Sequence, residues 1–108
     1  MNLKEQNEIC VNFFKDCADN LERKGADYTV DGDVFKDVMD EARSMGVNPT
    51  AIIWLAMNKH YKAVRRYCTE GKVESEPIRG RLLDLVNYAV ILISLIEHLQ
   101  EKDGSEKS

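Results

Sequence analysis

Apolar residues recur at helical spacing along four stretches of the chain, and none of these stretches alternates apolar and polar residues as a β-strand would. Residues 3–24 are expected to form the first helix, which Gly25 should end. Its apolar stripe comprises Ile9, Phe13, Cys17 and Leu21. After a turn-rich segment, residues 33–45 are expected to form a second helix, with Asp33 as its cap and Gly46 as its end.

The third helix has the clearest start signal, because Asn48 is a good N-cap and the proline after it suits the first helical position. We predict this helix over residues 49–69, with Gly71 as its end. Trp54 and Tyr61 lie in one of its apolar stripes, where core packing is favoured over stacking on a ligand base. A short loop follows, so the third and fourth helices should pack antiparallel.

The fourth helix, expected from residues 75–77 to residue 100, is apolar on two faces. One face is a heptad-like seam formed by Ile78, Leu82, Leu85, Ala89, Leu92, Ile96 and Leu99. The other is formed by Leu83, Val86, Val90 and Ile93. Such a helix is either central in its bundle or buried in an oligomer interface, so we expect a homodimer or tetramer formed through it. The predicted fold is all-α, a four-helix bundle-like single domain over residues 1–100 with a disordered tail over 101–108.

Composition adds the expected class and compartment. A hydrophobic share of 44% and a charged share of 31% are ordinary for a soluble globular domain. The polar start argues against a signal peptide, and no apolar run reaches the length of about 18 residues that predicts a membrane span. Three cysteines without C-x-x-C spacing argue against a disulfide framework or a zinc site. These features predict a cytoplasmic protein without membrane contact.

Charge is distributed unevenly along the chain. The net charge of −4 disfavours a general nucleic-acid binder. Residues 59–81 nevertheless hold seven basic side chains against three acidic ones. This basic segment is either a local site for a phosphate-bearing ligand or a solvated helix end.

Asp84 is the candidate functional residue with the most unusual surroundings, because it lies in the apolar fourth helix one turn before Asn87 and Tyr88. A carboxylate is costly to bury unless something pairs with it. The pairing group is either a structural partner, for which Arg81 and Lys59 are the candidates, or a ligand.

Antiparallel packing of the third and fourth helices would bring Lys59 and Lys62 toward Glu76, Arg81 and Asp84. Cations, a carboxylate and an amide are the groups that the phosphates of a nucleotide and their metal ion require. His60 lies in an apolar stripe, where a histidine is either a satisfied core residue or a ligand-binding one.

Three stretches of the chain carry a family resemblance. They are RKGADY at 23–28, MNKHYKAVRRY at 57–67 and SEPIRGRLLDLVNYAVIL at 75–92. Together they resemble small phage and bacterial proteins of the nucleotide modification associated domain 1 group, which is similar to a distant branch of the MazG-like all-α nucleoside triphosphate pyrophosphohydrolases. The positions that match the group's pattern are Lys24, Asp27, Tyr28, Lys59, Lys62, Glu76, Asp84, Asn87 and Tyr88.

The resemblance implies a nucleotide or nucleotide-like phosphate ligand and, in an enzyme, Mg²⁺-dependent hydrolysis of a nucleoside triphosphate to the monophosphate and pyrophosphate. The metal ligands would be Glu76 and Asp84. The expected ligand-binding residues are Lys59, His60, Lys62, Arg79, Arg81, Asn87 and Tyr88.

The chain also departs from the group's pattern, because Asn58 and Gly80 stand where carboxylates are typical. Metal-assisted hydrolysis needs enough anionic ligands to hold the cation and activate water. A second function class therefore stays open, a non-enzymatic interaction protein that sequesters a nucleotide signal or inhibits a host or defence factor. In a third interpretation Asp84 is only a structural ion-pair partner.

Overall fold

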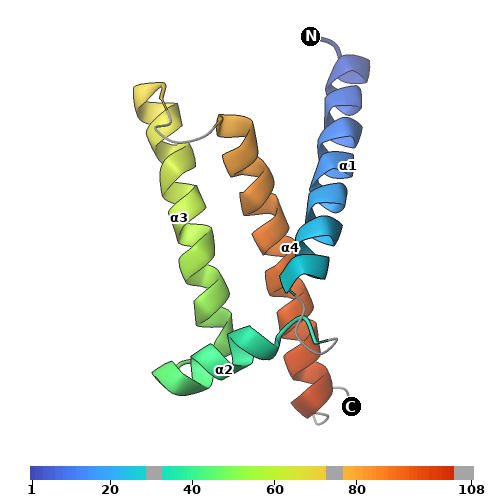
Figure 1. Ribbon diagram of the computed structural model, residues 1–108. Coiled ribbons are helices and arrows are strands. Elements are labelled where there is room, and N and C mark those ends of the chain that lie inside the picture. Colours follow the sequence, from blue (N-terminus) through green and yellow to red (C-terminus); the bar gives the residue numbers. More distant parts are fainter. Residues whose placement is uncertain (29–32, 73–76, 104–108) are drawn as a thin grey trace.

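The structure, a computed structural model, describes residues 1–28, 33–72 and 77–103, with side chains for all of these except 26–28 and 103. The described residues form four α-helices and no strand, which confirms the predicted all-α class (Figure 1). The helices are α1 (Leu3–Tyr28), α2 (Lys36–Met45), α3 (Pro49–Glu70) and α4 (Ile78–Asp103).

The ends of α3 confirm the prediction made from its capping residues. The side-chain oxygen of Asn48 accepts a hydrogen bond of 2.9 Å from the backbone N–H of Thr50, and the helix starts at Pro49. Gly71 ends it in the left-handed conformation, with φ 76°, and its N–H donates to the carbonyl oxygen of Tyr67. Gly46 ends α2 in the same way, with φ 70°.

Three other helix ends differ from the prediction. Helix α1 continues through Gly25 to Tyr28, since a glycine inside a helix costs only about 1 kcal/mol and does not have to end it. Helix α2 begins at Lys36 instead of residue 33, because the Asp33 carboxylate accepts from the nearby N–H of Phe35 at 2.8 Å and forms a local turn. Helix α4 extends to Asp103, into the predicted tail, whose residues 104–108 lie outside the described part.

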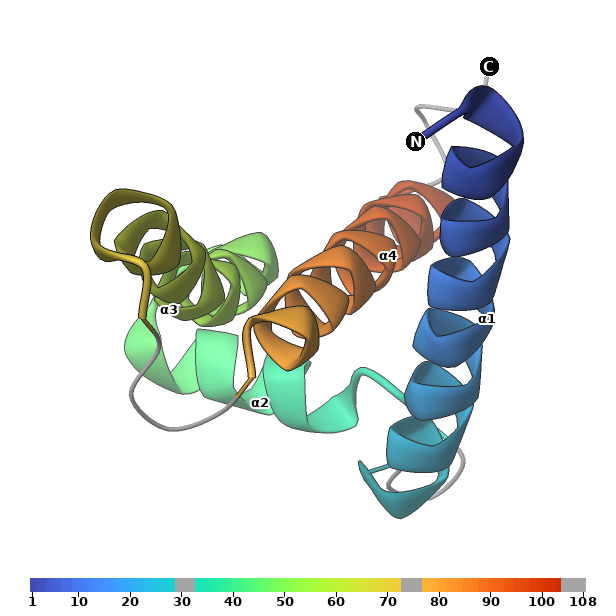
Figure 2. The same cartoon turned by 90° about the horizontal axis from the view of Figure 1, so that it is seen from above.

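The helices form an open arrangement in which α4 is central. Helices α3 and α4 lie side by side and antiparallel, as expected, while α2 crosses the end of this pair and packs on α3 (Figure 1, Figure 2). Among the described helices α1 contacts only α4, and its N-terminal half extends away from the others. The radius of gyration is 16.4 Å, whereas a compact chain of this length has about 13 Å.

The hydrophobic core is small and lies where α2, α3 and α4 meet. Its buried members are Phe35, Ile53 and Leu95, and the last is completely buried. Leu95 belongs to neither predicted stripe of α4, whereas Leu82 and Ala89 of the predicted seam are exposed. Partly buried side chains around the core are Val38, Met39, Met57, Tyr88, Ile91, Leu92 and Leu99.

Large apolar side chains remain on the surface of the isolated chain. Trp54 is 56% exposed and Tyr61 is 53% exposed, so the prediction that both pack in the core is wrong. Phe14 of α1 and Ile93 of α4 are also about half exposed. By length and composition α4 is apolar enough to cross a membrane, and only 11% of its apolar window is buried. One such helix is weak evidence for a span, because helices of soluble bundles meet the same criteria.

Candidate functional site

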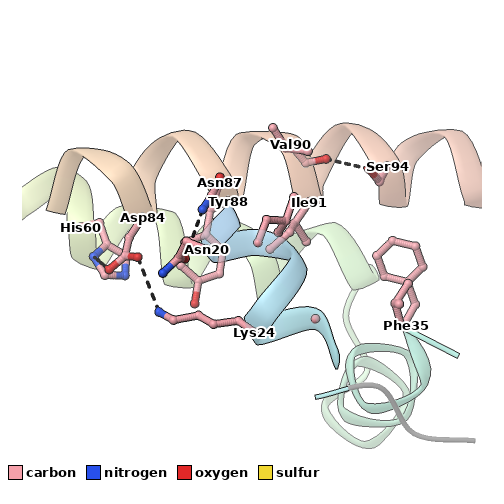
Figure 3. Close-up of a pocket in the computed structure, with 13 residues that line it drawn as sticks. Asn20, Lys24, Phe35, His60, Asp84, Asn87, Tyr88, Val90, Ile91 and Ser94 are labelled. Carbon is pink, nitrogen blue, oxygen red and sulfur yellow. Dashed lines mark hydrogen bonds and ion pairs between the residues drawn. The ribbon is translucent and has the colours of Figure 1, made fainter. Parts of the chain in front are cut away.

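A pocket of about 500 Å³ lies between the C-terminal half of α1 and the middle of α4, with α3 at one end (Figure 3). Its size is in the range of about 300–1,000 Å³ that holds small organic ligands in proteins. The residues that line it are Asn20, Leu21, Lys24, Gly25, Val34, Phe35, His60, Asp84, Asn87, Tyr88, Val90, Ile91 and Ser94. Most of the lining is apolar, and the polar groups gather at the end nearest His60 and Asp84.

Asp84 lies at this polar end with two basic neighbours. One carboxylate oxygen is 3.7 Å from the Lys24 ammonium, and the other is 3.9 Å from Nδ1 of His60. The Asp84 side chain is only 19% exposed, whereas that of Lys24 is 52% exposed. Both distances are longer than the roughly 2.7–3.2 Å of a hydrogen bond. Asp84 therefore has two basic neighbours but no donor at hydrogen-bond distance among the described side chains.

His60 is buried, and Tyr88 and Arg81 both contact its ring. It stacks on the Tyr88 ring, with centroids 5.4 Å apart and an angle of 27° between the planes. The Arg81 guanidinium lies 3.3 Å from Nδ1 of His60. Because a guanidinium only donates hydrogen bonds, Nδ1 is the acceptor, and the proton of the neutral ring is then on Nε2. In this arrangement His60 does not donate to Asp84.

An amide pair joins α1 to α4 beside the carboxylate. The Asn87 side-chain amide donates to the side-chain oxygen of Asn20 at 3.3 Å, and Asn87 is buried (Figure 3). Each amide has two acceptor lone pairs and two N–H groups, and one bond uses only part of that capacity. The pair therefore supports the wall of the pocket and leaves polar groups for a ligand.

The opposite end of the pocket is mainly apolar. Phe35 and Ile91 lie toward this end, as does Ser94, and Leu21 is a further apolar lining residue, on α1. Phe35 also packs on the ring of His98, with centroids 5.3 Å apart, which fixes the position of the Phe35 ring. A ligand with one polar edge and an apolar body would match the two ends.

The structure brings together some of the predicted site residues. His60, Asp84, Asn87 and Tyr88 all line the pocket. Lys59 and Lys62 are instead exposed on α3 and are not lining residues.

The predicted arginines and the second carboxylate lie elsewhere. Arg79 is 2.6 Å from the Asp16 carboxylate and covers the Phe13 ring, outside the pocket. Arg81 contacts His60 from outside the lining, and Glu76 lies beyond the described residues.

Helix α1 supplies polar pocket residues that were not among the predicted ligand-binding residues, although Lys24 was one of the positions that match the family pattern. Arg81 and Lys59 were the expected structural partners of Asp84, but the structure places Lys24 beside it. Asn20 was not considered. The signal was present, since Asp16, Asn20 and Lys24 follow one another at four-residue steps and so share one face of α1.

The described residues supply few ligands for a metal ion. No three His, Cys, Asp or Glu side chains within these ranges form a group that could hold one. Among the described residues that line the pocket Asp84 is the only carboxylate, and the nearby ammonium of Lys24 competes with a cation for it. A Mg²⁺ site would therefore depend on residues such as Glu76, outside the described part.

No family model, curated protein or solved structure matches this chain. The family resemblance of its motifs remains an expectation, and the chemistry of the pocket is the main guide to function.

Proposed function

We propose that this protein binds a nucleotide or a nucleotide-like phosphate ligand in the pocket between α1 and α4, as a MazG-related protein would. The observation that carries the proposal is the position of Asp84, which lines a pocket of about 500 Å³ and whose ion pair with Lys24 is long, at 3.7 Å. Among the described side chains it has no donor at hydrogen-bond distance, and a ligand that donates to it would compensate for the cost of its partial burial.

The two ends of the pocket support a ligand with a ring and a polar edge. The apolar wall around Phe35 and Ile91 offers contact area for a flat ring or a sugar. Asp84, Asn20 and Asn87 offer acceptors and donors at the other end.

Phosphate groups would extend toward the rim of the pocket. Lys24 is the only Lys or Arg among the lining residues that the structure describes, it is half exposed, and its flexible stem lets it turn toward an anion. Lys59, Lys62, Arg79 and Arg81 remain predicted phosphate ligands. They would reach a bound ligand only from outside the pocket.

Hydrolysis is the catalytic form of this proposal. A nucleoside triphosphate and water would give the monophosphate and pyrophosphate. Mg²⁺ would then be held by Asp84 and Glu76, and Asn20 and Asn87 alone would contact the edge of the ring. The test measures pyrophosphate release from a triphosphate panel with and without Mg²⁺, together with thermal stabilisation by the same compounds. Turnover supports the enzyme, stabilisation without turnover supports a nucleotide-sequestering protein, and no stabilisation by any nucleotide contradicts the proposal.

A second function, a non-enzymatic interaction protein, is favoured by the exposed apolar side chains Phe14, Trp54 and Ile93. They suit a second copy of this chain, joined through α4, or a host protein. Light scattering on the purified protein should give a dimer or tetramer, and Ile93→Glu should shift it toward the monomer. A natural chain that is monomeric at all concentrations would contradict self-association.

A further inference from the structure

We infer that the pocket selects a planar nitrogen heterocycle with two adjacent N–H donors on one edge, the pattern that guanine presents. This inference rests on the proposed function, since it names the class of ring that the nucleotide ligand would carry. Its basis is that the two carboxylate oxygens of Asp84 are hydrogen-bond acceptors in the lining of the pocket, while the nearest donors of the described side chains are too far away to form hydrogen bonds with them.

Within the described part of the chain, neither oxygen of Asp84 accepts a close hydrogen bond from a side chain. An ionised carboxylate offers about four lone-pair directions. The Lys24 ammonium is 3.7 Å from one oxygen and lies on a half-exposed side chain. Nδ1 of His60 is 3.9 Å from the other, and it accepts from Arg81. A ligand that brings two donors would therefore replace water at both oxygens and would not displace a close protein bond.

Two parallel acceptors match two parallel donors. The ring N–H and the neighbouring amino group of guanine point in the same direction, at the spacing of a carboxylate, and form charge-assisted bonds with it. Adenine and cytosine place a lone pair beside their amino group, which a carboxylate repels. Uracil has one N–H between two carbonyl groups, and hypoxanthine lacks the amino group. Asp84 would thus discriminate among the common bases by the pattern of donors and acceptors along one edge of the ring.

The surroundings of Asp84 require that the donors belong to a flat ring. Tyr88 is one helical turn further along α4, lines the same pocket and is already stacked on His60. A ring that meets the carboxylate edge-on would extend along the aromatic and apolar wall toward Ile91. A simple ammonium would satisfy Asp84 but would leave this wall without contacts.

The test compares the binding of three 5′-monophosphates, GMP, IMP and AMP, by calorimetry without added metal. The phosphate and sugar are constant across the series, so differences report on the base. We expect GMP to bind at least about tenfold more tightly than IMP or AMP. Each of these two ligands lacks one of the two N–H donors that guanine offers to the charged carboxylate.

The variant Asp84→Asn gives a second readout. It replaces two acceptors by one acceptor and one donor, which matches the edge of adenine, so the preference should move from GMP toward AMP. Asp37→Asn is the matched control, because it makes the same change at an exposed position of α2 and should leave the ranking unchanged. If Asp84→Asn does not fold, the ranking on the natural chain still decides.

Equal binding of the three monophosphates to the natural chain would overturn the inference and leave the proposed function intact. Binding of none of them, nor of any other nucleotide, would remove the proposed function as well. Stabilisation by Mg²⁺ alone that Asp84→Asn abolishes would make Asp84 a metal ligand and overturn the inference.

Discussion

Helix α4 has two contact surfaces of different chemistry. Toward α3 and α2 it presents an apolar face centred on Leu95, which packs against Ile53 and Phe35. Toward α1 the described contacts include three polar pairs, in which Asp16 meets Arg79, Asn20 meets Asn87 and Lys24 meets Asp84. The first contact excludes water, whereas the second encloses the pocket.

The comparison shows where stability and function are separated in this chain. Burial of a large aliphatic side chain contributes about 1.5–3 kcal/mol, and exposed ion pairs contribute about 0–1 kcal/mol. We therefore expect the α3–α4 contact to hold the fold together and the α1–α4 contact to be the adjustable one. A pocket wall that is attached by weak polar pairs can move to admit a ligand.

Breaking the apolar contact should have the largest effect. Leu95→Ala leaves a cavity at the completely buried position and should lower the free energy of unfolding by about 2–5 kcal/mol. The measurement is urea denaturation followed by circular dichroism. Leu55→Ala is the matched control, because this leucine of α3 is 57% exposed and the loss should be about 1 kcal/mol or less. Equal losses in the two variants would contradict the assignment of the core.

Breaking the polar contact should loosen α1 without unfolding the rest. Arg79→Ala removes the partner of Asp16 and the group over Phe13, and it should lower the free energy of unfolding by no more than about 1 kcal/mol. The buried thiol of Cys17, on α1, reports the opening. With Cys10 and Cys68 replaced by serine, thiol labelling at Cys17 should become several-fold faster in the variant. The rates are compared at high pH, where the thiol is ionised in both proteins, because burial raises the pKa of Cys17 and the Arg79 charge itself lowers it.

The control for this labelling is Arg43→Ala, which removes a pair within α2 and should not change the rate. Burial raises the pKa of the Cys17 thiol, so its labelling should need a higher pH than that of the exposed Cys10. A Cys17 that reacts as fast as Cys10 in the natural chain would show that α1 does not rest on α4.

The smallest effect is expected at Asp40, which contacts Lys36 and Arg43 on α2. The hydrogen bond from Lys36, together with the charges of Lys36 and Arg43, lowers the pKa of Asp40 below its usual 3.8. A lowered folded-state pKa contributes stability above the unfolded value, and this is lost as the pH falls through the folded value. At pH 7 the melting temperature of Asp40→Asn should therefore be slightly lower than that of the natural chain. In strong acid the two proteins should melt at the same temperature as each other. A difference that persists unchanged in acid would contradict the pairing.

Local signals predicted the helices better than they predicted the faces that meet. The caps at Asn48 and Gly71 act within one turn of the chain, so their effect could be foreseen from neighbouring residues. The prediction that Gly25 ends the first helix was wrong because a glycine permits a helix to end but does not by itself end it. Leu95 was missed because the apolar spacing of α4 fits several faces, and contact with α2 and α3 selects among them.

The candidate site was predicted from one side only. Asp84, Asn87, Tyr88 and His60 could be chosen because a polar residue in an apolar stripe is conspicuous in the sequence. Their partners on α1 could not be chosen in the same way, since polar residues on a surface helix are ordinary. Lys24 and its neighbours acquire significance only when α1 lies against α4.

The central claim is that Asp84 and the α1–α4 wall receive a guest molecule. Nuclear magnetic resonance of the side-chain amides of Asn20 and Asn87, during addition of GMP to the natural chain, tests it most directly. The account predicts that both pairs of resonances shift in a saturable way, because the two amides lie beside the carboxylate in the pocket. Shifts confined to the exposed face of α3 around Lys59 and Lys62, with the two amides unchanged, would contradict it.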